Sequence, residues 1–210
     1  MEYKCVQFTY MPVSIPYPQI FLRLGYSREK TLLLPGEEAK IRDWIMEAAG
    51  IIKLKGAALR MPVQSRTPEQ IYVRDTCLTS KNFSKFASEA EELLLMGVTG
   101  SKAVMEKIRE LYEQDFAKAV VFDAAASEIV DAGLDWITVY FKRQLVREGK
   151  VISKNRFSAG YGDFALENQR FFYTLLNMRE LGVELNPSFQ LLPEKSVTAA
   201  AVIYKENQSC

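Results

Sequence analysis

The chain has 210 residues with 27 basic and 26 acidic side chains and no histidine, so its formal net charge at pH 7 is +1. A balance this even gives no electrostatic case for binding nucleic acid or an anionic membrane. The lack of histidine excludes Ser-His-Asp and Cys-His catalysis and histidine-ligated zinc. The composition is that of a globular protein with 48% hydrophobic residues, and the length suits a single α+β unit spanning residues 1–210.

The cysteines and the apolar segments bear on the cellular compartment. Cys5, Cys77 and Cys210 are odd in number and widely scattered, which is typical of free thiols rather than of a disulfide framework or a metal site. Residues 1–5 contain no apolar signal core, and no apolar run is long enough to cross a bilayer. We therefore expect a cytoplasmic protein with no bound metal and no membrane partner.

The first fifty residues predict a strand, a loop and a helix. Residues 3–10 alternate in polarity and are rich in β-prone side chains, which favours a strand. Three prolines predict a loop over residues 11–19, followed by a helical turn over residues 20–24. A helix is expected over residues 35–50, with an apolar stripe formed by Ile41, Trp44, Ile45 and Ala48.

The next segment has the pattern of a buried sheet. Strands are expected over residues 50–63 with a bulge or bend at Gly56, over residues 70–73 and over residues 91–99. A turn over residues 65–69 and a short helix over residues 81–87 connect them. The following Gly100-Ser101-Lys102 resembles part of a phosphate-binding loop but lacks its Gly-Lys-Ser/Thr ending, so a strand-to-helix turn is the better interpretation.

Residues 101–147 are predicted to form two helices. The second has a long apolar face that we expect to include Phe116 and Val120. Asp131 and Asp135 lie one turn apart on this helix and share a face. The simpler interpretation is a solvated acidic face, and the alternative is that Asp131 contacts a ligand.

The last third of the chain contains the only stretch with the character of a binding site. After a linker over residues 149–153, Arg156 begins a tight loop in which Gly160 and Gly162 flank Tyr161. Glycine readily takes positive φ and lets a ligand approach the main chain, so Tyr161 is expected to stand out from the loop. Asp163 is expected to cap a helix over residues 163–178, and a final apolar strand is predicted over residues 197–204.

These residues carry a resemblance to a known family. Arg156, Gly160 and Tyr161 match the Arg-x-x-x-Gly-Tyr signature of the S-adenosylmethionine-binding activation domain of cobalamin-dependent methionine synthase. The later segments 182–185 (Gly-Val-Glu-Leu) and 193–197 (Pro-Glu-Lys-Ser-Val) resemble that domain in the same order. The resemblance is clear over the last third of the chain, and it implies a twisted antiparallel sheet flanked by helices and curved around a ligand groove.

The resemblance also implies a site. It assigns S-adenosylmethionine as the cofactor and gives as its contacts Arg156, Ser158, Ala159, Gly160, Tyr161 and Asp131. Tyr161 and Glu167 are implied to face the corrin, with Glu167 standing where the family has a histidine. Ala199, Ala200 and Ala201 stand where the family has aromatic residues near the ligand.

The function implied is that of a stand-alone activation domain. It would support reductive methylation of cobalamin in a methionine synthase that lacks its own activation domain, without a catalytic residue of its own. A chain without histidine cannot supply the lower ligand of cobalt, so cobalamin is expected on the cobalamin-binding domain of the partner synthase. A flavodoxin-like or ferredoxin-like protein is the expected electron donor. The alternatives are a corrinoid-protein docking or chaperone module without methyl-donor chemistry, and an unrelated small-molecule enzyme on the same fold.

Overall fold

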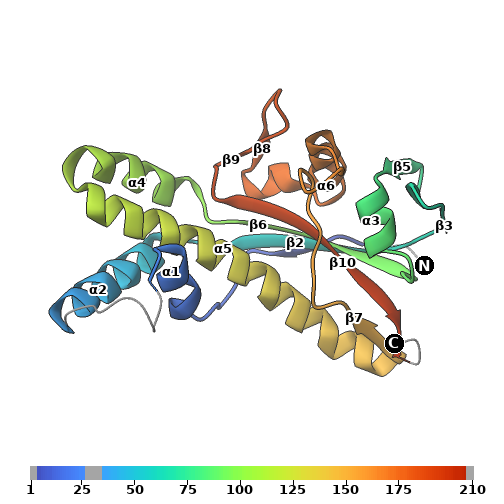
Figure 1. Ribbon diagram of the computed structural model, residues 1–210, viewed down its shortest axis with the longest axis horizontal. Coiled ribbons are helices and arrows are strands. Elements are labelled where there is room, and N and C mark those ends of the chain that lie inside the picture. The colour runs from blue at the N-terminus through green and yellow to red at the C-terminus, as the bar shows by residue number, and fades with distance from the viewer. Residues whose placement is uncertain (1–3, 27–34, 207–210) are drawn as a thin grey trace.

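A computed structural model describes residues 4–26 and 35–206, and its centre is a five-stranded antiparallel sheet (Figure 1). The strands, in their order across the sheet, are β1 (Val6–Phe8), β2 (Lys55–Pro62), β6 (Glu92–Thr99), β10 (Ser196–Lys205) and β7 (Lys150–Ile152). Each of the four pairings is antiparallel. The predicted α+β class with a helix-flanked antiparallel sheet is therefore confirmed, whereas the extent of the unit over residues 1–210 stays a prediction.

The sheet is covered on both faces. One face packs against the larger helices, which are α1 (Tyr17–Arg23), α2 (Pro35–Ile51), α4 (Lys102–Gln114) and α5 (Phe116–Leu145) (Figure 1). The other face packs against α3 (Lys81–Phe86), α6 (Gln169–Leu175), η3 (Met178–Leu181) and a small sheet of β3 (Ser65–Arg66), β4 (Gln70–Val73) and β5 (Thr76–Thr79). Every residue of β6 is buried, because neighbours such as Leu93 and Leu94 point into opposite cores.

Small residues let the long helix α5 lie close to the sheet. A Cβ atom added at Gly133 of α5 would stand 2.7 Å from Cγ1 of Val98 on β6. A Cβ atom at Gly56 would stand 2.8 Å from Sδ of Met11, and Gly56 pairs in regular register with Val98. The predicted bulge or bend at Gly56 is therefore not a bulge, and this glycine is needed for close packing.

Several predicted elements differ from the structure in ways that have a local cause. Helix α1 begins at Tyr17, inside the predicted loop over residues 11–19, because a proline such as Pro18 is compatible with the first turn of a helix. The predicted linker over residues 149–153 contains β7, which pairs with the end of β10. Strand β3 lies within the predicted turn over residues 65–69.

Other differences concern the helices and the short strands. The helix predicted over residues 163–178 is confined to α6, preceded by the 3₁₀ turn η2 (Leu166–Asn168). Strand β5 and the hairpin of β8 (Glu184–Leu185) and β9 (Leu191–Leu192) were not predicted. Phe116 and Val120 are exposed rather than inward-facing. The free-thiol prediction holds for Cys5 and Cys77, and Cys210 lies outside the described residues.

Within residues 4–26 and 35–206, no helix is both long enough and apolar enough to span a membrane.

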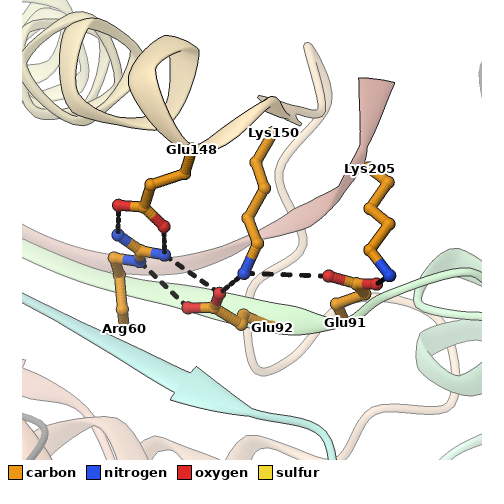
Figure 2. A network of polar contacts seen from close by, with 6 residues as sticks. All are labelled: Arg60, Glu91, Glu92, Glu148, Lys150 and Lys205. Carbon is orange, nitrogen blue, oxygen red and sulfur yellow. Dashed lines mark hydrogen bonds and ion pairs between the residues drawn. The ribbon is translucent and has the colours of Figure 1, made fainter. Parts of the chain in front are cut away.

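An ion-pair network joins the strands at one end of the sheet. Figure 2 shows its six members, which are Arg60, Glu91, Glu92, Glu148, Lys150 and Lys205. Two nitrogens of the Arg60 guanidinium lie 2.7 Å from the carboxylate of Glu148 in η1 (Val146–Glu148), and Nη2 of Arg60 also lies 2.9 Å from Oε1 of Glu92. Lys150 on β7 donates to the same Glu92 carboxylate. The network therefore connects β2, β6 and β7 with the segment that follows α5.

Glu92 is the least exposed member, with 8% of its side chain accessible. Burial alone would raise the pKa of Glu92, but the hydrogen bonds from Arg60 and Lys150 outweigh burial and hold the pKa below its usual range. A carboxyl whose pKa is lower in the folded chain stabilises the fold above its unfolded pKa. This stabilisation is lost as the pH falls through the folded pKa.

The substitution Glu92→Gln is expected to lower the free energy of unfolding by about 3 kcal/mol near neutral pH, because it leaves Arg60 and Lys150 without their shared carboxylate. The difference from the unsubstituted chain should shrink as the pH falls from the unfolded-chain pKa of about 4.3 through the lower pKa of the folded carboxyl. Urea unfolding followed at a series of pH values measures both effects.

Glu91→Gln is the matched control for this experiment. Glu91 contacts Lys150 and Lys205 in the same network but is more exposed, with 31% of its side chain accessible. Its removal should cost about 1 kcal/mol or less. Equal losses in the two variants, or a loss in Glu92→Gln that does not change at low pH, would contradict the assignment.

Candidate functional site

The loop that contains Arg156 is fixed to the edge of β10. The backbone N–H of Ser153 donates to the carbonyl oxygen of Val202 at 2.8 Å, just after β7 ends. Phe157 and Ala200 then exchange two backbone hydrogen bonds of 2.9 and 2.8 Å. The chain therefore continues alongside β10 beyond β7, and Arg156 lies immediately before the second attachment point.

Two phenylalanines of the loop, Phe157 and Phe164, anchor it against α3. The ring of Phe164 stacks on Phe83 of α3 with a centroid separation of 4.5 Å and an interplanar angle of 12°. The ring of Phe157 lies 5.5 Å from both Phe83 and Phe86. Aromatic rings bury a large apolar area in a defined geometry, so these contacts hold both ends of the loop in the core.

Asp163 holds the loop to a different helix from the one predicted. Its carboxylate accepts hydrogen bonds from the hydroxyl of Ser80 at 2.5 Å and from the backbone N–H groups of Lys81 at 2.7 Å and Asn82 at 3.1 Å. It therefore caps α3, and the predicted cap of the helix after the loop is wrong. The hydrogen bond from Ser80 is the main reason why the pKa of Asp163 is lowered.

The two glycines take the positive φ angles that the sequence predicts, +90° at Gly160 and +57° at Gly162. Tyr161 between them is 67% exposed, as expected for a residue at the tip of the loop. The backbone N–H of Gly160 donates to the carbonyl oxygen of Phe164 at 2.7 Å. This amide closes the loop, so the role of Gly160 is to shape the site rather than to offer its N–H group.

A cavity of about 960 Å³ lies beside the loop. Of the residues predicted for the site, those that line it are Asp131, Arg156, Ser158, Ala159 and Tyr161. Gly160 and Glu167 do not line it, although Leu166, the neighbour of Glu167, does. Helix α5 and the loop supply most of its charged groups, and the segment from β9 to the first part of β10, which includes Glu194, supplies another part of the wall. A cavity of this size suits a ligand as large as a nucleoside derivative.

Arg156 is the charged centre of the cavity wall. Its side chain is 20% exposed, and Nη2 lies 2.9 Å from Oδ2 of Asp131. Its Nη1 contacts the carboxylate of Asp135, one turn further along α5. The two aspartates are therefore partners of an arginine from a distant segment rather than a purely solvated acidic face.

Two carboxylates around one guanidinium leave a local excess of negative charge. Burial raises the pKa of the Asp131 carboxyl, the charge of Arg156 opposes that rise, and the nearby carboxylates of Asp135 and Glu128 add to it. An incoming cation near Asp131 would relieve this repulsion. The arrangement can thus receive an anionic group at Arg156 and a cationic group at the aspartates.

Some residues of the cavity wall were not found from the sequence. Buried Gln169 donates through Nε2 to Oγ1 of Thr198 at 2.6 Å, and both side chains line the cavity. Lys154 and Glu194 add one charge of each sign. The signal that was overlooked is Gln169 itself, a polar residue followed closely by Phe171 and Phe172 on an inward-facing helix.

The structure also explains why β10 has alanines at positions 199–201. Ala199 lines the cavity, and Ala200 and Ala201 are fully buried in the two opposite cores. Larger side chains at the latter two positions would collide with packed layers. Among the described residues, no group of three or more acidic, cysteine or histidine side chains is arranged to hold a metal ion.

Comparison with solved structures identifies the fold. The crystal structure of the MetH reactivation domain bound to AdoHcy matches this chain with a TM-score of 0.66 and 14% sequence identity. The match covers 100% of this chain and 80% of that chain. No protein-family model matches the sequence, and no curated protein is similar to it at a significant level. The chain therefore has the fold of the MetH reactivation domain, and the predicted resemblance is confirmed at the level of the fold.

The geometry of the loop generates a stability prediction for Gly162→Ala. The new Cβ atom would lie 2.4 Å from Nδ2 of Asn82 and would require a positive φ. The free energy of unfolding should fall by about 2–3 kcal/mol, from the strained φ and the contact together. Denaturant unfolding measures the change.

Gly149→Ala is the matched control, because Gly149 has a similar φ of +64° with no atom within 4 Å of an added Cβ. It should lose only the conformational part, about 1 kcal/mol. If both variants lost the same amount, the closeness of Asn82 to position 162 would add nothing to the cost of the new Cβ atom.

Proposed function

We propose that this chain binds S-adenosylmethionine in the cavity beside Arg156 and supports reductive methylation of cobalamin held by a methionine synthase that lacks its own activation domain. The observation that carries the proposal is the position of Arg156. It lies on the wall of a cavity of about 960 Å³ with Asp131, Ser158, Ala159 and Tyr161. The solved domain of the same fold is bound to AdoHcy, the demethylated counterpart of this ligand.

The charged groups of the cavity match the amino-acid part of the ligand. A guanidinium binds a carboxylate through two parallel hydrogen bonds, so Arg156 would receive the ligand carboxylate. Asp131, which pairs with Arg156, would receive the ammonium and sulfonium cations, and the exposed ring of Tyr161 would offer a π-face to the sulfonium. The backbone around Ser158 and Ala159 would receive the adenosine part, with Gly160 shaping the turn.

The proposed role needs orientation rather than acid–base chemistry. Reduced cobalamin on the partner would supply the nucleophile that accepts the methyl group as the bond between the methyl carbon and sulfur breaks. This chain therefore has to hold the sulfonium methyl group toward the cavity mouth and to keep water away. Tyr161 and Glu167 are exposed and are proposed to face the corrin. The reducing electron would come from a flavodoxin-like or ferredoxin-like protein.

A second candidate is a corrinoid-protein docking or chaperone module without methyl-donor chemistry. It is favoured by the exposed apolar side chains of Tyr161 and Leu166 at the cavity. The alanines at positions 199–201, where the resembled family has aromatic residues near the ligand, also favour it.

Isothermal titration calorimetry with S-adenosylmethionine tests the binding site. The unsubstituted chain should bind saturably, and Arg156→Ala should weaken binding by about tenfold or more, the effect of losing a charge-assisted hydrogen bond. Arg147→Ala, which removes an exposed arginine from η1, should leave the affinity unchanged. If Arg156→Ala bound as tightly as the unsubstituted chain, the assignment would be wrong.

Complex formation with a cobalamin-binding domain separates the two candidates. For the reactivation role, association should be strengthened by S-adenosylmethionine and weakened at least severalfold by Tyr161→Ala, because a buried interface aromatic contributes strongly. Analytical ultracentrifugation with and without the ligand measures this. Association of equal strength with and without S-adenosylmethionine would favour the docking module.

A further inference from the structure

A second cavity lies at the other side of the strand pair β6–β10. Its volume is about 680 Å³, and none of its lining residues belongs to the cavity around Arg156. Its wall is formed by the first residue of β2, the end of β6, the start of α4 and the segment from η3 to β8. Segments that are far apart in the chain therefore meet here.

Cationic side chains converge on this cavity. Lys55 from β2, Lys102 from α4 and Arg179 from η3 line it, against the single carboxylate of Glu184 on β8. Lys102 Nζ lies 3.6 Å from Oε1 of Glu184, a distance that leaves this pair loosely joined. Neither Lys55 nor Arg179 forms an ion pair among residues 4–26 and 35–206. The wall therefore carries an excess of positive charge.

The N-terminus of α4 opens onto the same cavity. Helix α4 has 13 residues, its N-cap Ser101 makes no side-chain capping hydrogen bond, and its first turn contains no acidic residue. The N-terminal N–H groups of a helix carry partial positive charge and attract anions. In contrast, Ser80 and Asp163 cap α3, and Asp115 caps α5.

An unpartnered buried hydroxyl belongs to a residue of the same cavity wall. The Oγ atom of Ser101 is buried and is the one buried side-chain nitrogen or oxygen without a hydrogen-bond partner in the described part of the chain. Buried polar groups are almost always hydrogen-bonded, so this hydroxyl is free to bond to a water molecule or to a ligand in the cavity. Ser101 lines the cavity, beside the first N–H groups of α4.

We propose that this second cavity binds the phosphate group of a small organic molecule. The phosphate would accept hydrogen bonds from the Ser101 hydroxyl and from the first amides of α4, and it would pair with Lys55, Lys102 and Arg179. A helix N-terminus combined with convergent cations is an arrangement suited to phosphate. A cavity of about 680 Å³ exceeds the size of a phosphate ion and leaves room for an attached organic group.

In this proposal the turn Gly100-Ser101-Lys102 binds phosphate, although it lacks the full phosphate-loop motif. The proposal is independent of S-adenosylmethionine, because the two cavities share no lining residue. Binding at one site can be lost while binding at the other remains.

Calorimetric titration of the full chain with inorganic phosphate, pyrophosphate and adenosine monophosphate tests the proposal, with citrate as an anion that lacks phosphate. At least one phosphate compound should bind saturably and more tightly than citrate. Arg179→Ala and Lys55→Ala should each weaken it about tenfold or more. Lys142→Ala, which removes an exposed lysine from the last turn of α5, should not change it. Tighter binding of adenosine monophosphate than of the two inorganic ions, kept in Arg156→Ala and weakened in Arg179→Ala, would identify a phosphate ester as the ligand class of this cavity.

A second measurement locates the bound phosphate. The amide signals of Lys102 and Ala103 should shift on addition of the tightest phosphate compound, and Ser101→Ala should reduce both the shift and the affinity severalfold. Three results would overturn the proposal: no saturable binding of any phosphate compound, equal binding of citrate, or binding that is the same in Arg179→Ala, Lys55→Ala and Lys142→Ala.

Discussion

The position of the site depends on the backbone pairing between Phe157 and Ala200. Strand β6 pairs with one side of β10 from Ser196 to Ile203, but β7 covers the other side only at its end. The pairing at Ala200 occupies part of the remaining edge and brings the loop against the sheet. The ring of Phe157 packs into the core at the same point, so the neighbouring Arg156 is directed toward α5.

The packing around β10 and α5 explains how a long helix and a cavity can lie side by side on the sheet. Alanines on β10 and Gly133 on α5 allow close packing, and the fully buried β6 supports the sheet from its centre. At the far end of the sheet, the network around Glu92 joins four structural segments (Figure 2). The cavity walls are therefore built on strands and a helix that are packed on several sides. The exposed part of the loop that contains Arg156 is short.

The sequence predicted what is encoded locally. The long helices, the strands β4 and β6 and the positive φ angles of the loop follow from periodicity and from glycine positions, and the structure agrees with them. The errors involve partners that are distant in the chain. Asp163 caps α3 across 81–83 positions, and β7 is a strand because β10 offers an edge. Of the site, the sequence placed Arg156 and Asp131 in it but did not reveal that Asp135 pairs with the same guanidinium.

The pairing of Arg156 with two aspartates defines what kind of ligand the cavity favours. An anion that approaches the guanidinium must compete with Asp131 and Asp135, so a simple anion gains little and meets two negative charges. A ligand that carries a carboxylate and a nearby cation replaces the lost contacts on both sides, because its cation takes over the aspartates while its carboxylate takes over the arginine. The ion pairs of Arg156 are thus exchanged rather than broken, and this exchange favours an amino-acid end group over a carboxylate alone.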